Sequence, residues 1–312
     1  MLSHCLDKIN GGVFWSLTFD GCVFDDTKHT YNQAFAIYAL SSYFKLTGNQ
    51  LALKTALSIF DKIENTCRDD EGYLEAFSCD WRVQSNEKLS ENGVLADKTM
   101  NTLLHVFEGY SNLYTCTHSK VVSEAMRRCI AIYSRKIYDP IRHQQKVFFD
   151  SHYNSILDIC SYGHDIEASW LFDEGSSLLN DEMISSEIIK IDNELAKAVY
   201  EKAYKGNSVV NECECGVVDE TRIWWVQAEA VVGFVNLFQK CGEEKYSHAA
   251  ANILEYIQNY LIDKRDGSEW FWCLNKDKIP IPEKPIVEPW KCPYHNGRMC
   301  MELIRRNPEI YV

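Results

Sequence analysis

Residues 161–170 read Ser-Tyr-Gly-His-Asp-Ile-Glu-Ala-Ser-Trp, and this stretch decides how the chain folds. Apolar residues recur at helical spacing from His164 onward, which predicts a helix over 164–180. His164, Glu167 and Trp170 stand three positions apart, so their side chains share one face of that helix. The stretch therefore begins a helix and places a histidine, a carboxylate and a tryptophan together near its start.

Comparable positions recur along the chain at a long interval. Counted from His164, His105 lies 59 positions earlier and Trp225 lies 61 positions later. Phe35 precedes His105 by 70 positions, and His295 follows Trp225 by 70. Ordinary helical solenoids repeat every 34 to about 47 residues. The longer interval here suits a pair of helices plus a long loop, repeated around a ring.

Helical periodicity predicts nine helices in pairs that are joined by short turns. Helix stops are predicted at Gly48, Gly206, Gly242 and Asp139-Pro140. Longer segments separate the pairs, and short β-hairpins or ordered loops are expected at 10–29 and 145–162. The predicted helices are 30–46, 49–67, 98–116, 119–138, 164–180, 183–205, 221–240, 243–264 and 294–306. This pattern predicts an all-α fold, an α/α barrel whose inner helices present their N-terminal ends to a cleft; an irregular helical domain is the alternative.

Composition narrows the function. Lys and Arg total 32 against 45 Asp and Glu, a net charge of −13 that leaves no basic face for a nucleic acid. No run of 18 apolar residues could span a membrane. Thirteen cysteines form no regular framework, and the first residues hold no apolar stretch of signal-peptide length, so we expect free thiols in the cytoplasm. Cys213-Glu214-Cys215 lacks the spacing and the partner pair of a zinc site, so no metal is expected.

Two histidines at helix starts are candidates for proton transfer. Histidine titrates near neutral pH, as an acid or base at pH 7 must. His164 lies at one start, where the helix dipole favours its neutral form, although a simple capping histidine would look the same. His295 follows Pro293 at another start, beside Trp290 and Arg298. Tryptophan faces can pack on sugar rings, so the pair suggests carbohydrate chemistry.

Two further helices carry polar side chains on apolar backgrounds. Asn101, His105 and Glu108 form one stripe, and a hydrogen-bonded core histidine is the alternative interpretation. Trp225 and Glu229 stand at i and i+4, and a buried Glu229 would need a partner, either a histidine or a substrate hydroxyl. The motifs of metalloproteases, P-loop proteins, dinucleotide-binding proteins and serine hydrolases are absent from the sequence.

The sequence resembles a known family, the cellobiose 2-epimerases of the N-acylglucosamine 2-epimerase superfamily. The resemblance runs in order over nearly the whole chain. Its motifs are Gly-Val-Phe-Trp at 12–15, Tyr-Asn-Gln-Ala-Phe-Ala-Ile-Tyr-Ala-Leu at 31–40, Glu-Ala-Phe at 75–77 with Asp-Trp at 80–81, Gly-His-Asp-Ile-Glu-Ala at 163–168, Trp-Trp-Val-Gln-Ala-Glu at 224–229 and Trp-Lys-Cys-Pro-Tyr-His-Asn-Gly-Arg at 290–298.

The resemblance implies an (α/α)6 barrel of twelve helices and a single catalytic domain over residues 1–312. It also implies reversible epimerisation at C2 of the reducing-end glucose in β-1,4-linked disaccharides. Cellobiose would become glucosyl-mannose, and lactose or mannobiose would react likewise. The reaction would open the ring and pass through a cis-enediolate without a cofactor, in a protein that is a monomer in the family.

Residue roles are implied by the matching motifs. The resemblance implies that His164 and His295 act on opposite faces of C2 and that His105 helps open the ring or holds the C1 oxygen. Glu167 and Glu229 would orient histidines and hydroxyls. Trp225 and Trp290 would pack on the sugar units. The remaining cleft residues would be Tyr31, Asn101 and Trp170.

The chain departs from the family in two places. Leu103 stands where the family usually has a histidine. The chain also starts roughly 80 residues into the family pattern, about three helices with their loops, and an arginine of that segment has no counterpart by motif. We therefore expect an incomplete barrel, about nine of twelve helices, that exposes apolar helix faces and could associate with itself through its open edge.

Three alternatives stay open on sequence alone. One is an epimerase or isomerase of the same superfamily that acts on a monosaccharide such as N-acetylglucosamine or mannose. Another is a hydrolase or lyase on the same type of barrel, which would cleave its substrate. The last is an inactive partial barrel.

Overall fold

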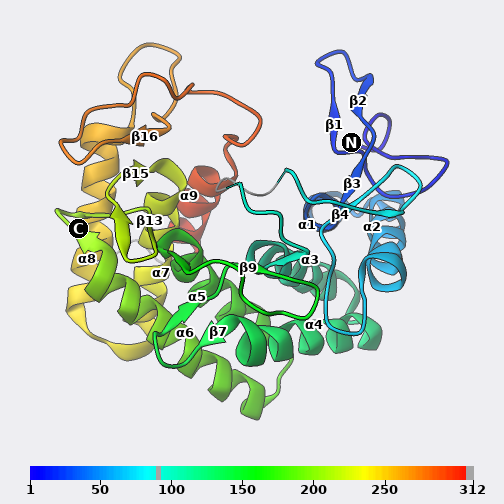
Figure 1. The fold of residues 1–312 in the computed structure, drawn as a ribbon, viewed down its shortest axis with the longest axis horizontal. Coiled ribbons are helices and arrows are strands. Elements are labelled where there is room, and N and C mark those ends of the chain that lie inside the picture. Colours follow the sequence, from blue (N-terminus) through cyan, green and yellow to red (C-terminus); the bar gives the residue numbers. More distant parts are fainter. Residues whose placement is uncertain (89–92, 307–312) are drawn as a thin grey trace. The chain divides into compact units, whose positions relative to one another are not determined.

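The structure is a computed structural model that describes residues 1–88 and 93–306 (Figure 1). Within these residues it holds nine α-helices, and every predicted helix is present. Short strands lie in the loops, so the predicted all-α fold with short β-hairpins is confirmed. The helices are α1 Thr30–Thr47, α2 Gln50–Lys62, α3 Met100–Thr117, α4 Lys120–Ile132, α5 Tyr162–Ser177, α6 Glu182–Ala203, α7 Trp224–Cys241, α8 Glu244–Tyr256 and α9 Tyr294–Arg306.

Three of the helices continue into a short π-helix. These are η1 Ile63–Cys67 after α2, η2 Tyr133–Ile137 after α4 and η3 Ile257–Leu261 after α8. Each belongs to the second helix of a pair and closes when the next residue donates its N–H to the first π residue. A π turn often marks a functional site, but its recurrence at one place in three pairs makes it part of the repeat.

Two of the predicted stops cap helices. Gly48 and Gly242 adopt the left-handed conformation, with φ of 69° and 73°, directly after α1 and α7. Gly206 does not cap a helix. The predicted helix over 183–205 ends at Ala203, because Tyr204 and Lys205 leave it to form a hairpin strand around Gly206.

The strands are two or three residues long, and four of them run directly into a helix. These four are β3 Lys28–His29 before α1, β6 Lys98–Thr99 before α3, β10 Ile159–Ser161 before α5 and β15 Arg222–Ile223 before α7. Each pairs antiparallel with a strand from another loop, which holds the N-terminal end of the helix in place. The others are β1 Ser16–Leu17, β2 Val23–Asp25, β4 Ala76–Phe77, β5 Val83–Gln84, β7 Tyr138–Asp139, β8 Gln144–Gln145, β9 Phe148–Phe149, β11 Tyr204–Lys205, β12 Ser208–Val209, β13 Glu212–Glu214, β14 Val217–Asp219 and β16 Cys273–Leu274.

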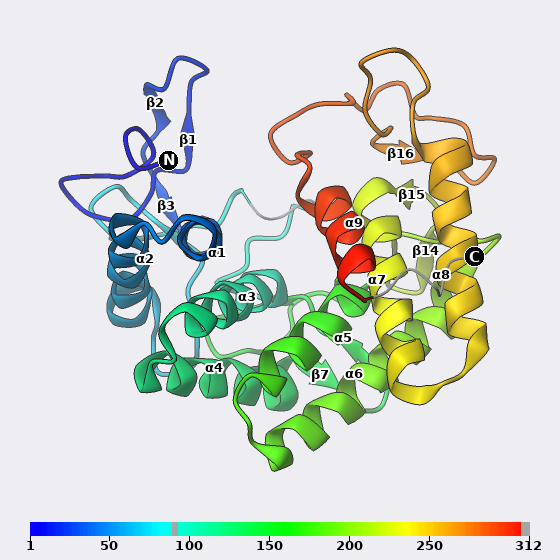
Figure 2. The same cartoon turned by 180° about the vertical axis from the view of Figure 1, so that it is seen from behind.

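Contacts between residues group the chain into two compact units. Unit 1 comprises 1–139, 146–157 and 171–188, and unit 2 comprises 140–145, 158–170 and 189–312. In unit 1, α1 packs against α2 and α3 around buried aromatic rings. In unit 2, α7 packs against both α8 and α9, as Figure 2 shows for the red helix α9. The single catalytic domain over 1–312 stays a prediction.

Some apolar side chains on helix surfaces are exposed, as expected for an incomplete barrel. On α1, Leu46 is 85% exposed, and on α9, Met301 and Ile304 are largely exposed as well. Self-association through such surfaces stays a prediction. Among the described helices, none combines the length and the apolar character that a bilayer span requires.

In each unit, one buried glutamine side chain makes two hydrogen bonds to the backbone of a single valine. In unit 1, the side chain of Gln33 accepts from the N–H of Val13 at 2.7 Å and donates to its carbonyl at 2.9 Å. In unit 2, Gln227 makes the same two bonds with Val209, at 2.8 and 2.7 Å. Both glutamines are fully buried, so each amide satisfies the N–H and C=O of one buried valine.

The two hydrogen bonds between Gln227 and Val209 predict that replacing Gln227 lowers the stability of the protein. Gln227→Leu leaves the buried N–H and C=O of Val209 without partners, at about 1–3 kcal/mol each. We expect the free energy of unfolding to fall by about 2–6 kcal/mol, measured by denaturant titration. The matched control is Gln258→Leu, whose side chain is exposed in the same unit. A midpoint for Gln227→Leu equal to that of the control would show that Val209 finds other partners.

Candidate functional site

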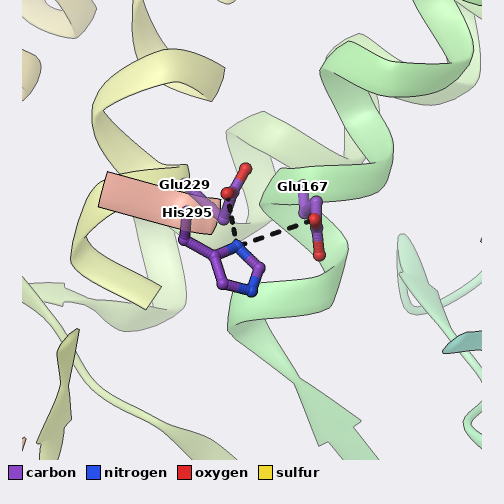
Figure 3. Close-up of side chains that lie close together, drawn as sticks. All are labelled: Glu167, Glu229 and His295. Atoms are coloured by element: carbon purple, nitrogen blue, oxygen red, sulfur yellow. Dashed lines mark hydrogen bonds and ion pairs between the residues drawn. The ribbon is translucent and has the colours of Figure 1, made fainter. Parts of the chain in front are cut away.

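The best-defined polar cluster lies in unit 2 and joins three helices. His295, near the start of α9, places its Nδ1 atom 2.7 Å from Oε1 of Glu229 on α7. The same Nδ1 atom lies 3.9 Å from Oε1 of Glu167 on α5. Figure 3 shows the imidazole reaching both carboxylates, which come from separate helices. Both carboxylate side chains are 1% exposed, whereas His295 retains 17% exposure.

Arg298 supplies the cation that these two buried carboxylates need. Its Nη2 atom lies 2.6 Å from Oε1 of Glu167 and 2.7 Å from Oε1 of Glu229. The guanidinium also packs on the rings of Trp170 and Tyr294, with centroid distances of 4.7 and 4.3 Å. Two buried carboxylates side by side would repel each other, so this shared arginine makes their proximity possible.

The cluster determines the charge of Glu229 and the orientation of His295. Burial alone would raise the pKa of Glu229, but Arg298 and then His295 outweigh it and hold that pKa well below its usual range. An ionised Glu229 can only accept, so Nδ1 of His295 is the donor. A neutral His295 then carries its lone pair on Nε2, the tautomer of a general base with a carboxylate behind it.

Trp170 forms a hydrogen bond with the second carboxylate oxygen of Glu229. Its indole N–H donates to Oε2 of Glu229 at 3.0 Å, and its side chain is buried, with 2% exposure. Both oxygens of Glu229 are thus engaged, Oε1 by Arg298 and His295 and Oε2 by Trp170. The carboxylate has no freedom to rotate away from the imidazole.

The same cluster could offer ligands to a metal ion. Glu167, Glu229 and His295 each present one ligand atom, all within 4.8 Å of one another. Arg298 already bonds the carboxylate oxygens that face one another. Its guanidinium stands where a cation would bind, and the arrangement therefore fits an ion-pair network better than a metal centre.

His164 lies beside the same tryptophan as His295. Its Nδ1 atom is 2.7 Å from the hydroxyl of Ser161, in the strand that precedes α5. Its ring centroid is 4.7 Å from that of Trp225, and the centroid of His295 is 5.3 Å from the same tryptophan. Gly163 permits this approach, because a Cβ atom there would come within 2.5 Å of Trp225. Two imidazoles therefore contact one indole, one held by a hydroxyl and the other by a carboxylate.

His105 belongs to a separate cluster in unit 1. Its Nδ1 atom lies 2.9 Å from Oε2 of Glu108, so the two members of the predicted polar stripe on α3 are in contact. The rings of Tyr31 and Phe35, both on α1, pack on the imidazole with centroid distances of 5.2 and 4.7 Å. Asn101 stands one turn earlier on α3 and is half-buried. His105 itself is 3% exposed.

Trp290 differs from the buried Trp170 because it is 44% exposed in the loop before α9. Its backbone N–H donates to Glu288 at 3.2 Å. It therefore offers an accessible indole face near the start of the helix that carries His295.

Sequence reasoning misses two partners of the candidate residues. It identifies Arg298 only as a neighbour of His295, yet this arginine is the cation shared by both glutamates. The available signal is its place three residues after His295, on the same helix face. Ser161 stands in the sequence only as part of the turn before His164, and it is the hydrogen-bond partner of that histidine.

Comparison with known proteins agrees with these observations. The model of the N-acylglucosamine 2-epimerase (GlcNAc 2-epimerase) family matches residues 1–296. A cellobiose 2-epimerase from Eubacterium cellulosolvens is 48% identical over 99% of this chain and 80% of its own length. The crystal structure of a sugar epimerase from a ruminal bacterium superposes with a TM-score of 0.97 at 44% identity, covering 98% of this chain and 79% of that one. A cellobiose 2-epimerase from Bacillus thermoamylovorans B4167 gives a TM-score of 0.94 at 40% identity, covering 98% of this chain and 79% of its own.

The ion-pair network predicts a large loss of stability when its cation is removed. Arg298→Met leaves Glu167 and Glu229 buried together, and we expect a loss of about 3–5 kcal/mol in the free energy of unfolding at pH 7. The lowered pKa of Glu229 stabilises the folded state above its ordinary pKa of 4.5, and this contribution is lost as the pH falls below that value. The gap between variant and wild type should therefore narrow in acid, as measured by thermal unfolding across pH.

Arg305→Met is the matched control for that measurement. Arg305 lies on the same helix, is 56% exposed and pairs with Glu302. An exposed pair contributes only about 0–1 kcal/mol. Equal losses in the two variants at every pH would contradict the role given to Arg298.

Proposed function

The chain belongs to the N-acylglucosamine 2-epimerase family, and we propose that it epimerises the reducing-end glucose of β-1,4-linked disaccharides at C2. Cellobiose would become glucosyl-mannose, with lactose and mannobiose as further substrates. The observation that carries the proposal is the pair of imidazoles, His164 and His295, on one tryptophan. Relatives at 43–48% identity are named cellobiose 2-epimerase, which supports the same substrate class.

The proposed mechanism depends on how each histidine is held. Each histidine uses Nδ1 for a protein partner, and in the proposed mechanism Nε2 is the atom that faces the sugar. One imidazole in neutral form takes the C2 proton, while the other, protonated, returns a proton to the opposite face. The intermediate between the two proton transfers is a cis-enediolate of the ring-opened sugar. Epimerisation needs a proton donor and an acceptor on two faces, and two histidines with separate supports meet that need.

The two supports differ in charge. Glu229 is anionic and accepts from Nδ1 of His295, whereas Ser161 places a neutral hydroxyl against Nδ1 of His164. Glu167 and Arg298 hold Glu229 in place, and Trp170 secures its second oxygen. We assign Trp170 to this support, because its indole N–H is engaged by Oε2 of Glu229.

The remaining candidates are assigned to substrate binding and ring opening. His105, backed by Glu108, would help open the ring or hold the C1 oxygen. Tyr31 and Asn101 would bind nearby hydroxyls. Trp225 and Trp290 would pack on the two sugar units, and the exposed indole of Trp290 supports a substrate longer than one sugar. No cofactor is required by this chemistry.

We place the protein in the cytoplasm. All thirteen cysteines are unpaired in the structure, and Cys67, Cys129, Cys160 and Cys273 are buried as thiols. Unpaired cysteines in this number suit a reducing compartment.

A second candidate is an epimerase or isomerase of the same family that acts on a monosaccharide. The family description names N-acylglucosamine, which is the observation in its favour. The identity to cellobiose 2-epimerases and the exposed Trp290 favour the disaccharide. Turnover of cellobiose compared with N-acetylglucosamine and mannose separates the two.

Proton NMR of cellobiose incubated with the protein in D2O tests the proposed reaction directly. We expect the reducing-end H2 signal to disappear while mannose-type anomeric resonances grow, because C2 exchanges its proton with solvent. Release of free glucose would indicate a hydrolase. An unchanged cellobiose spectrum from a folded sample would contradict the proposal, and exchange only in N-acetylglucosamine or mannose would establish the monosaccharide alternative.

Substitution of the two histidines tests their roles. His164→Ala and His295→Ala should each lower the rate of epimer interconversion by at least 10²-fold, since a positioned acid or base contributes about 10²–10⁴. His248→Ala is the control, because His248 is exposed on α8. The comparison is valid only if all three variants show the wild-type circular dichroism spectrum, which indicates that they are folded. Interconversion that persists in either site variant would remove that histidine from the mechanism.

A further inference from the structure

His295 lies at the start of α9, and the segment before this helix contains little regular structure. Between β16 and α9 the structure describes only two isolated bridges, Leu274 with Pro280 and Glu288 with Lys291. Backbone pairing of the kind that holds α5 and α7 at their first residues is missing from this described segment. The place of His295 must therefore depend on side-chain contacts.

Glu269 makes such contacts on both sides of His295. Its Oε2 atom forms an ion pair with Nζ of Lys291, four residues before the histidine. Its Oε1 atom accepts from the side-chain amide of Asn296, the residue after the histidine, at 3.0 Å. The Lys291 side chain is 0% exposed, and a buried ammonium group needs a paired anion. One carboxylate thus clamps the chain before and after His295.

Glu269 is itself held by a compact turn at the end of η3. The N–H of Asp263 donates to the carbonyl of Glu269 at 3.2 Å. The Asp263 carboxylate accepts from the N–H of Arg265 at 3.1 Å and from the hydroxyl of Ser268 at 2.6 Å. These bonds close the turn on itself, so the clamp attaches the start of α9 to a rigid part of unit 2.

The clamp also reaches the imidazole through Trp224. Nζ of Lys291 lies 5.2 Å from the centroid of the Trp224 ring. That indole is 1% exposed and meets the His295 ring edge-on, at 5.4 Å and 77°. Moving Lys291 would therefore disturb a wall of the histidine as well as the backbone beside it.

We propose that Glu269 is a positioning residue for His295: it sets where the imidazole stands, while Glu229 sets how the ring is turned. The inference rests on the proposed function for its consequence in catalysis. Proton transfer depends steeply on placement, and a displacement of about 1 Å can cost on the order of 10²-fold in rate. Glu269 does not touch the sugar in this scheme and acts only through the clamp.

The test is Glu269→Gln, which keeps the shape of the side chain and removes its charge. We expect kcat for cellobiose to fall about 10- to 100-fold, with KM within about threefold of wild type because sugar contacts are unchanged. Amide hydrogen exchange should become faster across residues 291–298. Glu283→Gln is the control, since Glu283 is exposed in the loop before α9, and it should match wild type in both measurements.

Lys291→Met is the second variant, and it cuts the same clamp from the other side while it keeps the apolar stem. If the two residues act as one unit, the double variant should be no slower than the slower single variant. Lys291→Met alone, measured for kcat and for hydrogen exchange at 291–298, decides the matter if Glu269→Gln fails to fold. A lowered melting temperature with unchanged kcat would overturn the proposal, because it would show a purely structural role.

Hydrogen exchange separates this proposal from the proposed function. If wild type leaves every sugar unchanged, the epimerase assignment fails, yet faster exchange at 291–298 in both variants would still support the clamp. Exchange equal to wild type in both variants would overturn the clamp, whatever the activity.

Discussion

One guanidinium holds the described site together. Arg298 on α9 bonds Glu167 on α5 and Glu229 on α7, and without it two carboxylates with 1% exposure would face each other in the protein interior. Burial of unpaired charge is among the largest penalties in a protein, so these three helices can meet here only with the arginine between them. The arginine thereby also fixes the geometry of His295, because a Glu229 engaged on both oxygens presents its Oε1 atom to the imidazole from one direction.

The starts of the helices carry the candidate residues, and other contacts hold these helix starts in place. His164, Trp225 and His295 all lie within the first three residues of α5, α7 and α9. Strands fix the starts of α5 and α7, and Gln227 adds a buried anchor within the first turn of α7. For α9, the contacts of Glu269 take the place of a strand. The candidate side chains thus stand on backbone that is held independently of them.

Much of the fold was predictable because the signals that define a helix lie within a few residues of one another. Apolar periodicity and the stops at Gly48 and Gly242 placed all nine helices, and the ends that moved did so by few residues. The end of α6 was predicted two residues too late. Tyr204 leaves the helix and pairs with Val209 in a hairpin, and helix propensity takes no account of this pairing. The π segments were also not foreseen, because their sequences continue the helical pattern without a break.

Candidate residues were predictable in the same local sense. His164, Glu167, Trp225, Glu229 and His295 each stood out by type and spacing within one helix, and His105 and Glu108 were placed on one polar stripe of their helix. The contact between Arg298 and Glu167 spans 131 positions of sequence, and the contacts of Glu269 reach 22 and 27 positions along the chain. Periodicity within a helix cannot reveal such contacts.

The sequence by itself determined which segments form helices, where they pair and which residue types line their starts, because these depend on side chains a few residues apart. Only the tertiary structure decided which charges meet: that Arg298 serves two glutamates, that Glu229 rather than Ser161 supports His295, and that Glu269 clamps the start of α9. The physical reason is that burial makes each ionised group dependent on a specific partner, and that partner is chosen by the packing of helices rather than by their order along the chain.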